Sequence, residues 1–347
     1  MVVNKHRIGI INVTGYAGSE LARLLSRHPK VQLVSVTGRS EVGKKVNEVF
    51  PHLIDINLEI KPELDKVDLA FSALPHKASA EAILPLLEKN IRVIDISADF
   101  RLKDSKAYET WYDFTHPAPQ LLQNAVYGLP ELHREEIRSA KVIANPGCYP
   151  TGAILALAPA VREGIIESGI IVDGKSGLSG AGRSLTLTTH FTEANENACA
   201  YALSGHRHFP EISQELSSLT STALDITFLP HLIPMTRGIL SSCYAKVKSS
   251  SITDDEKGKE QLLKLYRNFY KNEPFVRVVD NSPQTKQTWG TNLCLIHPTV
   301  DQRTGRLIVI SAIDNLIKGA AGQAIQNMNL MMGFPEIMGL ESFAVYP

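Results

Sequence analysis

A predicted strand gives way to a predicted helix in the sequence Ala144-Asn145-Pro146-Gly147-Cys148-Tyr149-Pro150-Thr151-Gly152. The apolar run over 141–144 precedes this turn, and an alanine- and leucine-rich run over 153–161 follows it. Pro146 and Gly147 interrupt both patterns, so we expect the strand to end before them and the helix to begin after them. Cys148 is therefore predicted at the N-terminus of a helix.

Cys148 is a candidate nucleophile because of this position. A helix N-terminus carries partial positive charge and free backbone N–H groups, and both favour a thiolate over a thiol. The same N–H groups can hold the oxyanion that forms when sulfur attacks a carbonyl. A buried structural cysteine is the alternative that the local sequence leaves open.

The composition indicates a globular protein of two domains, because the chain has 347 residues of which 44% are hydrophobic and 21% charged. With 36 basic and 36 acidic residues, the zero net charge argues against a nucleic-acid partner. The few, widely spaced cysteines include no C-x-x-C pair, which argues against a metal cluster and fits a reducing compartment. Residues 1–7 lack a signal-peptide core, and no apolar run could span a membrane, so we expect a cytoplasmic protein.

The first half of the chain alternates strands and helices. Strands are predicted at 7–13 and 31–37 with a helix at 19–28 between them, and the first turn is Thr14-Gly15-Tyr16-Ala17-Gly18. Glycines in such a turn let a pyrophosphate approach the backbone at a helix N-terminus, although a purely structural turn is the alternative. Arg39 and Ser40 follow the second strand, where they suit a 2′-phosphate better than a ribose hydroxyl; a solvated basic loop is the alternative.

Further strands are predicted at 67–76 and 91–97, with a helix at 78–89. Because the carboxyl ends of parallel strands form the ligand crevice, Arg101 is a candidate for an anionic substrate group, with a surface ion pair equally open. We predict a long ordered loop over 111–129, which is rich in prolines and aromatic residues.

The second half indicates a mixed sheet. Strands are predicted at 169–175, 224–229, 238–247 and 306–313, with an exposed amphipathic helix from Asp254 to Tyr270 and an apolar-sided helix from Asn315 to Met332. The fold class is therefore α/β, a Rossmann-type doubly wound parallel sheet with a second mixed α/β domain. We expect residues 1–148 and 315–347 to form the first domain and residues 149–314 the second.

Two histidines flank an arginine in His206-Arg207-His208, and either could act as an acid or base near neutral pH. Pro210 and Glu211 suit the first turn of a helix that follows. No third ligand with suitable spacing supports a metal site, and a surface histidine pair is the remaining alternative.

These motifs resemble those of the N-acetyl-γ-glutamyl-phosphate reductases of arginine biosynthesis, over essentially the whole chain. The resemblance lies in the glycine turn and in the segments 95–102, 145–151, 175–183, 205–212 and 311–316. It implies an aspartate-semialdehyde-dehydrogenase-like architecture, NADP(H) as cofactor, a small-molecule acyl-phosphate substrate and a homo-oligomer, either dimer or tetramer. The family usually has glycine at the position of Asn12.

By this resemblance Cys148 is the nucleophile, His208 the acid/base and Glu211 its support. The residues implied to bind the cofactor are Thr14, Gly15, Tyr16, Ala17, Gly18, Arg39, Ser40, Ser72, Leu74, Pro75, Ser179, Gly180 and Asn315. Those implied to bind the substrate are Ser97, Arg101, Asn145 and Arg207.

The implied reaction is the reductive dephosphorylation of N-acetyl-L-glutamyl 5-phosphate to the 5-semialdehyde through a cysteine thioester. A related reductase of aspartyl phosphate or of carrier-linked aminoadipyl phosphate is the alternative within enzymes. A nucleotide-binding sensor without chemistry is the alternative from another class, but a sensor needs no Cys–His pair.

Overall fold

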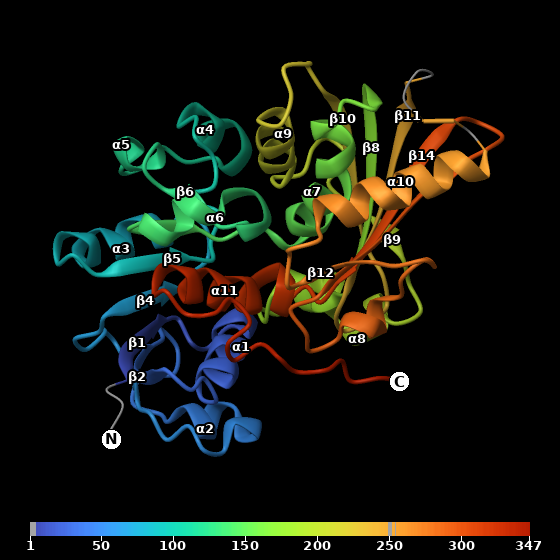
Figure 1. Cartoon of the computed structure of the whole chain (residues 1–347). Coiled ribbons are helices and arrows are strands. Elements are labelled where there is room, and N and C mark those ends of the chain that lie inside the picture. Colours follow the sequence, from blue (N-terminus) through green and yellow to red (C-terminus); the bar gives the residue numbers. More distant parts are fainter. Residues whose placement is uncertain (1–4, 249–251, 254) are drawn as a thin grey trace. The chain divides into compact units, whose positions relative to one another are not determined.

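The computed structural model describes residues 5–248, 252–253 and 255–347 and divides into two compact units (Figure 1). The first contains the chain up to Gly147 together with Ala320–Ser342, and the second contains Cys148–Gly319 together with Phe343–Pro347. Residues 315–319 and 343–347, which the sequence analysis assigns to the first domain, thus lie in the second unit. They are tied there by hydrogen bonds such as that from Val345 N–H to the Trp289 carbonyl oxygen.

The first unit is built on a parallel sheet of seven strands in the order β3-β2-β1-β4-β5-β7-β6. Because β2 and β4 lie on opposite sides of β1, the strand order reverses there, as in doubly wound sheets. The predicted parallel sheet is confirmed. Its strands are β1 (His6–Ile11), β2 (Val31–Thr37), β3 (Ile60–Lys61), β4 (Leu69–Ser72), β5 (Arg92–Asp95), β6 (Val126–Tyr127) and β7 (Val142–Ala144).

The helices of the first unit connect these strands, except α11 (Gly322–Met331), which comes from the C-terminal part of the chain. They are α1 (Tyr16–Leu25), α2 (Val46–Val49), α3 (Ser79–Glu88), α4 (Lys106–Tyr112), α5 (Pro119–Leu122), α6 (Pro130–Ser139) and α11. The prediction of a loop over 111–129 is wrong, because this stretch contains the end of α4, all of α5 and strand β6. Pro119 begins α5, where its missing N–H costs no helical hydrogen bond.

The second unit contains a mixed seven-stranded sheet in the order β12-β13-β14-β11-β8-β10-β9. Strand β8 runs parallel to β10 and antiparallel to β11, which confirms the predicted mixed sheet. Strands β9, β12 and β13 are not among the strands predicted from the sequence; Pro298 lies inside β13, and proline argues against a central strand. The strands are β8 (Ile166–Ser176), β9 (Cys199–Ala200), β10 (Asp225–Leu232), β11 (Ile239–Val247), β12 (Val276–Val278), β13 (Cys294–Asp301) and β14 (Arg306–Ile313).

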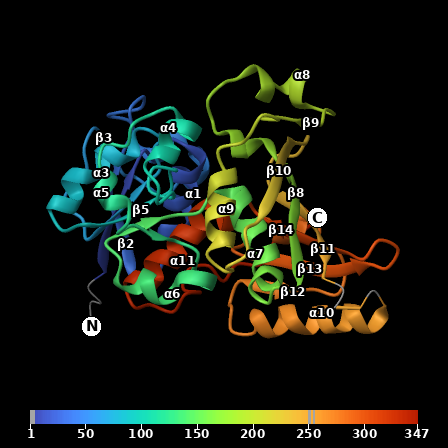
Figure 2. The same ribbon diagram turned by 90° about the horizontal axis from the view of Figure 1, so that it is seen from above.

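Helices α7 (Cys148–Arg162) and α10 (Glu256–Phe269) belong to the same layer of this unit (Figure 2). The hydroxyl groups of Tyr266 and Tyr270 donate to carbonyl oxygens of α7 at 2.8 and 2.6 Å. Helix α10 agrees with the helix predicted from Asp254, a residue that lies outside the described part of the chain, as do residues 1–4.

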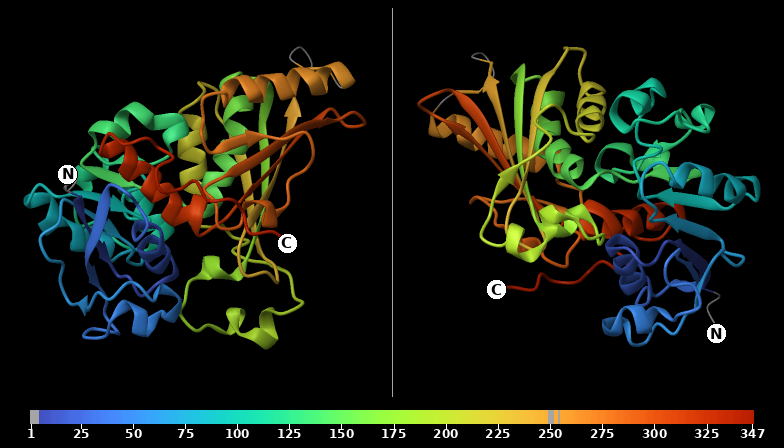
Figure 3. Two further views of the ribbon diagram at one scale, coloured as in Figure 1. Left: turned by 60° about the horizontal axis from the view of Figure 1, so that its bottom comes forward. Right: turned by 180° about the vertical axis from the view of Figure 1, so that it is seen from behind.

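The serine- and glycine-rich run after β8 is ordered and contains a 3₁₀ turn at Leu178–Ala181. The chain then passes through α8 (Phe191–Ala194) before it returns to the sheet as β9 (Figure 3). The predicted helix 315–332 is divided into a π-helical turn, Ile317–Ala321, and α11. Helix α11 is buried on all sides rather than on one. Within the described residues, no helix has both the length and the apolar character needed to cross a membrane.

Candidate functional site

Cys148 is the first residue of α7, four residues after the end of β7. The predicted order of strand, turn and helix is confirmed. The Cys148 side chain is partly exposed, whereas Cys243 and Cys294 are buried and Cys199 lies on the short strand β9. Burial raises the pKa of the Cys243 thiol to about 12. Cys148 therefore combines accessibility with the backbone N–H groups of a helix N-terminus.

Gly319 lies directly behind Cys148. A Cβ atom on Gly319 would come within 2.7 Å of the Cys148 Cβ atom and 3.1 Å of its Cα atom. Contacts this short leave no space for a side chain, so the backbone of residue 319 is in direct contact with the cysteine. The position of Gly319 therefore limits where Cys148 can lie.

Tyr149 connects Cys148 to the histidine segment. Helices α7 and α9 (Phe209–Ser217) pack against each other, and the Tyr149 ring centroid is 6.1 Å from that of His208 and 6.0 Å from that of His206. The Tyr149 hydroxyl donates to the His231 carbonyl oxygen at 2.8 Å. Gly174 admits the ring, since a Cβ atom there would lie 2.7 Å from ring carbons. Tyr149 is thus held on two sides and forms one wall of the site.

His206 and His208 lie together. Their ring centroids are 4.8 Å apart, and His206 Nδ1 accepts the backbone N–H of His208 at 3.1 Å. The backbone turns here, with Gly205 at φ 128° and Phe209 N–H bonded to the His206 carbonyl oxygen, so the two rings meet at a turn and not on one face of a strand.

The two histidines differ in environment. His206 is 8% exposed, and burial, assisted by the charge of Arg207, lowers its pKa to about 4. His208 is the N-cap residue of α9 and is partly exposed. Glu211, in the first turn of α9, is fully buried, whereas Arg207 is exposed. His206 is therefore neutral at pH 7.

The glycine turn of the first unit begins at Asn12, which has φ 65°. This left-handed conformation favours glycine, but asparagine tolerates it. The Asn12 Nδ2 group donates to the Ala73 carbonyl oxygen at 2.9 Å, and its Oδ1 atom accepts from Thr14 Oγ1 at 3.1 Å. A Cβ atom on Gly18 would collide with the Asn12 carbonyl oxygen and lie 2.8 Å from the Val13 Cα atom. Asparagine thus adopts here the conformation that glycine favours.

The N-terminus of α1 is open. Gly15 is its N-cap residue without a side-chain cap, and the nearest atom to a Cβ built there is Asn12 Nδ2 at 3.9 Å. Arg39 and Ser40 are exposed after β2. A phosphate group fits such a cradle of N–H groups. The other positions implied to bind cofactor in this unit are Tyr16 and Ala17 in α1, Ser72 at the end of β4, and Leu74 and Pro75 just after it.

Ser97 belongs to a buried network of hydroxyl and carboxyl groups after β5. Its hydroxyl donates to Asp95 Oδ2 at 2.8 Å and accepts the backbone N–H of Asp99 at 3.1 Å. Ser79 Oγ donates to Asp95 Oδ1 at 2.6 Å and contacts Ser72 Oγ. Burial, reinforced by the neighbouring Asp99 carboxylate, raises the pKa of Asp95 to about 6.

This raised pKa has a consequence for stability. Between about pH 4 and 6 the folded chain keeps a proton on Asp95 that the unfolded chain has lost, so this group makes folding less favourable as the pH rises through that window. Asp95→Asn stays neutral, and we expect its free energy of unfolding, relative to wild type, to increase from pH 4 to pH 6.5. Urea unfolding at the two pH values measures this difference, and an unchanged difference would contradict it.

Arg101 and Asn145 are both buried, and a hydrogen bond joins the Arg101 side chain to the backbone of Asn145. Arg101 Nε donates to the Asn145 carbonyl oxygen at 2.8 Å, and one of its terminal nitrogens donates to the Ile96 carbonyl oxygen at 2.8 Å. The Asn145 amide donates to the Ala320 carbonyl oxygen and accepts from Asn327. Arg101 is thus not a surface ion pair; it fixes the turn that leads to Cys148.

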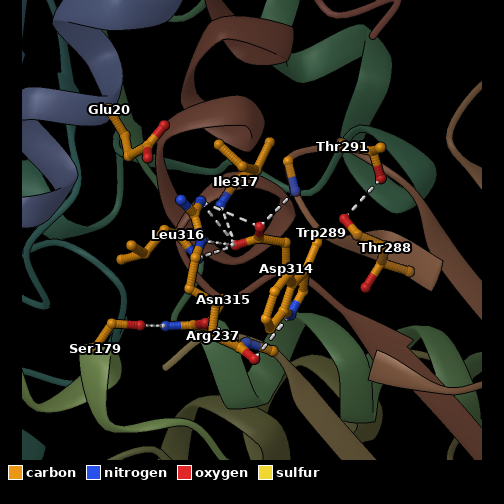
Figure 4. Close-up of polar contacts among 12 residues, drawn as sticks. Glu20, Ser179, Arg237, Thr288, Trp289, Thr291, Asp314, Asn315, Leu316 and Ile317 are labelled. Atoms are coloured by element: carbon orange, nitrogen blue, oxygen red, sulfur yellow. Dashed lines mark hydrogen bonds and ion pairs between the residues drawn. The ribbon is translucent and has the colours of Figure 1, made fainter. Parts of the chain in front are cut away.

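In the second unit, the predicted residues Ser179 and Asn315 meet across 136 positions of sequence (Figure 4). Asn315 Nδ2 donates to Ser179 Oγ at 3.0 Å, and its Oδ1 atom accepts the Gly238 N–H at 2.7 Å. Gly180 follows in the same 3₁₀ turn. The local sequence predicts no role for Asp314, Arg237, Tyr149 or Gly319, because their contacts are long-range. In the described part of the chain, no group of three or more His, Cys, Asp or Glu side chains could hold a metal ion.

Comparison with known proteins gives two family matches. Residues 7–140 match "Semialdehyde dehydrogenase, NAD binding domain", and residues 148–315 match "Semialdehyde dehydrogenase, dimerisation domain". The N-acetyl-gamma-glutamyl-phosphate reductase of Dehalococcoides mccartyi is 56% identical, covering 99% of this chain and 100% of the relative. The N-acetyl-gamma-glutamyl-phosphate reductase of Pelotomaculum thermopropionicum is 50% identical, covering 98% of this chain and 99% of the relative.

Solved structures show the same fold. Aspartate semialdehyde dehydrogenase II from Vibrio cholerae has a TM-score of 0.69 at 17% identity, over 95% of this chain and 99% of that one. Aspartate semialdehyde dehydrogenase with NADP from Candida albicans has a TM-score of 0.69 at 14% identity, with the same coverage. These identities are low, so the likeness is one of architecture.

Proposed function

The chain belongs to the family of N-acetyl-γ-glutamyl-phosphate reductases, and we propose that it reduces N-acetyl-L-glutamyl 5-phosphate to the 5-semialdehyde with NADPH, in arginine biosynthesis. Reductases of this kind are aldehyde-forming enzymes that act on acyl phosphates. The observation that carries the proposal is the accessible Cys148 at the start of α7, with Tyr149 in contact with the His208 ring.

Cys148 serves as the nucleophile in this proposal. Its thiolate attacks the acyl carbonyl carbon, a C–S bond forms, the C–O bond to phosphate breaks, and inorganic phosphate leaves. Backbone N–H groups at the start of α7 are suited to hold the oxyanion in that step. After reduction, the C–S bond of the thiohemiacetal breaks, which releases the aldehyde and restores the thiolate.

His208 serves as the acid/base, and two observations support this choice. The low pKa of His206 keeps that ring neutral, so it is a weak source of protons at neutral pH. His208 is also less buried than His206, and its backbone N–H is fixed by His206 Nδ1. In this scheme His208 gives a proton to the reduced oxygen and removes it as the aldehyde departs, while Glu211 supports His208 from the first turn of α9.

The cofactor supplies a hydride to the thioester carbon when it is bound. The open N-terminus of α1 supports the proposal that residues 14–18 hold the pyrophosphate, with Arg39 and Ser40 at the 2′-phosphate. The bonded pair of Ser179 and Asn315 is the second proposed cofactor contact.

The exposed Arg207 is proposed to hold an anionic group of the substrate. Ser97, Arg101 and Asn145 are the proposed substrate residues of the first unit, where their polar atoms bond to neighbouring backbone and carboxyl groups.

The reverse reaction tests the function. Wild type should reduce NADP⁺ when N-acetylglutamate semialdehyde and phosphate are both present, and omission of either should stop the reaction. Aspartate semialdehyde is the matched control substrate. Faster turnover of aspartate semialdehyde would overturn the choice of substrate, and no turnover of either would overturn the acyl-phosphate chemistry.

The choice of NADPH is tested at Arg39. A charge-assisted contact contributes about 1.5–3 kcal/mol, or roughly tenfold to a hundredfold. We expect Arg39→Ala to raise the KM for NADPH by that factor and to leave the KM for NADH nearly unchanged. Lys44→Ala is the control, because Lys44 lies on the same loop but is paired with Glu41 at 2.8 Å. Equal changes with both cofactors would remove Arg39 from the site.

We also propose a homo-oligomer formed through the sheet of the second unit. Ile171, which is 44% exposed, pairs in register with Tyr244, and Tyr244 pairs with Ile308 on the next strand, so these side chains form a partly exposed stripe across three strands. Such a stripe is typical of a face that is covered by another subunit.

Sedimentation measures the oligomer directly. We expect wild type to sediment as a dimer or larger, and Tyr244→Glu to sediment as a monomer because the stripe would then have to bury a charge. Lys257→Glu, on the exposed side of α10, is the control and should leave the mass unchanged. A monomeric wild type would contradict the proposal.

The four cysteines form no disulfide, which supports the proposed cytoplasmic location.

A further inference from the structure

Three segments of the second unit meet at the fully buried carboxylate of Asp314 (Figure 4). Its Oδ1 atom accepts the backbone N–H groups of Leu316 at 2.8 Å and Ile317 at 3.2 Å, and its Oδ2 atom accepts that of Gly290 at 2.8 Å. A terminal nitrogen of Arg237 lies 3.2 Å from Oδ1 and 3.1 Å from Oδ2. The carboxylate therefore binds its own turn and two distant loops.

Arg237 is itself held in place. The indole N–H of Trp289 donates to the Arg237 carbonyl oxygen at 3.0 Å, and the next residue, Gly238, donates to Asn315. A buried carboxylate is tolerated only when it is paired and hydrogen-bonded, and Asp314 meets both conditions. The network thus fixes the backbone from 314 to 317 against the segments that contain Arg237 and Trp289.

This fixed turn contacts the nucleophile through Gly319. The Gly319 N–H donates to the Asp314 carbonyl oxygen at 3.0 Å, and Gly319 lies against Cys148 without space for a side chain. The same turn carries Asn315, which is bonded to Ser179. A displacement of residues 314–319 would therefore change the position of Cys148 at the start of α7.

We propose that Asp314, with Arg237 as its partner, is a positioning residue for the nucleophile: it holds the 314–319 turn so that Gly319 fixes Cys148 at the N-terminus of α7. This inference rests on the proposed function, in which the Cys148 thiolate attacks the acyl phosphate. When the network is broken, Gly319 moves, and Cys148 loses part of the stabilisation that the α7 N–H groups give its thiolate.

Asp314→Asn tests this in the full-length chain. A carboxamide offers one acceptor oxygen where the carboxylate offers two, and its NH₂ group faces donors. We expect iodoacetamide to label Cys148 more slowly at pH 7, with the midpoint of the labelling profile moved to higher pH. We also expect kcat to fall by up to about 100-fold, as misplacement of a reacting group can cause. Labelling is followed by mass spectrometry of the Cys148 peptide.

Two further variants probe the same turn. Gly319→Ala leaves Asp314 and Arg237 intact but forces a Cβ atom against Cys148, and it should slow labelling in the same way. Arg237→Lys keeps the charge but loses the planar fork, and it should give a smaller effect in the same direction. Arg237→Lys also replaces Asp314→Asn if that variant does not fold.

Tyr266→Phe is the control for general destabilisation. It removes a buried 2.8 Å hydrogen bond from α10 to the Ala156 carbonyl oxygen, two turns along α7 from Cys148, and should lower the melting temperature without moving the labelling profile. A wild-type profile and kcat in Asp314→Asn, or an equal shift in Tyr266→Phe, would overturn the proposal. A wild type that labels as expected but lacks reductase activity would overturn the proposed function and not the positioning role.

Discussion

Cys148→Ser should fold like the wild type and lose turnover by on the order of 10⁴-fold or more, as enzymes do when a covalent nucleophile is removed. A hydroxyl group at the start of α7 still meets the same N–H groups, but it ionises far above neutral pH and cannot form the thioester. The melting temperature and the rate of NADP⁺ reduction, measured on the same sample, separate loss of chemistry from loss of fold.

The other three cysteines provide matched controls. Cys243 and Cys294 are buried in the sheet of the second unit, so alanine, which adds no buried hydroxyl, is the suitable replacement. Cys199 is exposed and accepts serine. We expect these variants to keep their activity and iodoacetamide to label Cys148 in each. Turnover by Cys148→Ser close to that of wild type would exclude the covalent mechanism.

The parts of the fold that could be predicted are those with a local signal: an apolar run that forms a strand, or a glycine or proline that ends an element. Apolar runs near residues 8, 33 and 69 form strands β1, β2 and β4, of which β4 is fully buried and the other two are buried in part, and glycine and proline separate the strands from the helices between. The stretch 111–129 could not be predicted, because α5 and β6 have four and two residues, too few to show a period.

The residues of the candidate site likewise include some that the local sequence indicates and others that only long-range contacts bring together. Cys148 and the histidine segment lie in local motifs, so the sequence indicates them directly. The pairs Arg237–Asp314 and Ser179–Asn315 join residues 77 and 136 positions apart, and nothing local signals such contacts. The neutrality of His206 follows from tertiary burial beside Tyr149 and Phe228, which its immediate neighbours in sequence do not reveal.

The structure shows how asparagine is accommodated at position 12 of the glycine turn. The resemblance implies glycine at this position, and Asn12 has the left-handed φ of 65° that glycine favours. Asparagine adopts that conformation and gains two side-chain hydrogen bonds, to Ala73 and Thr14. The close approach of Gly18 to the Asn12 carbonyl oxygen is the stricter requirement, because no side chain fits there.

His208→Asn should lower kcat by about 10²–10⁴-fold, the usual contribution of general acid–base assistance. Asparagine can still form hydrogen bonds from the N-cap position of α9, but it cannot take up or release a proton near neutral pH. His206→Asn is the matched control, since its ring is neutral at pH 7 and bonds the backbone of His208. We expect it to lower the melting temperature and to change kcat much less than His208→Asn does.

Labelling of Cys148 extends the test of His208 to the nucleophile. If His208 helps to stabilise the thiolate, iodoacetamide should label Cys148 more slowly in His208→Asn, without stopping, because the α7 N-terminus supplies the remaining stabilisation. Full turnover in His208→Asn together with collapse in His206→Asn would exchange the two roles. Full turnover in both would place the acid/base outside this segment, and the exposed loop around His190 would be the next place to look.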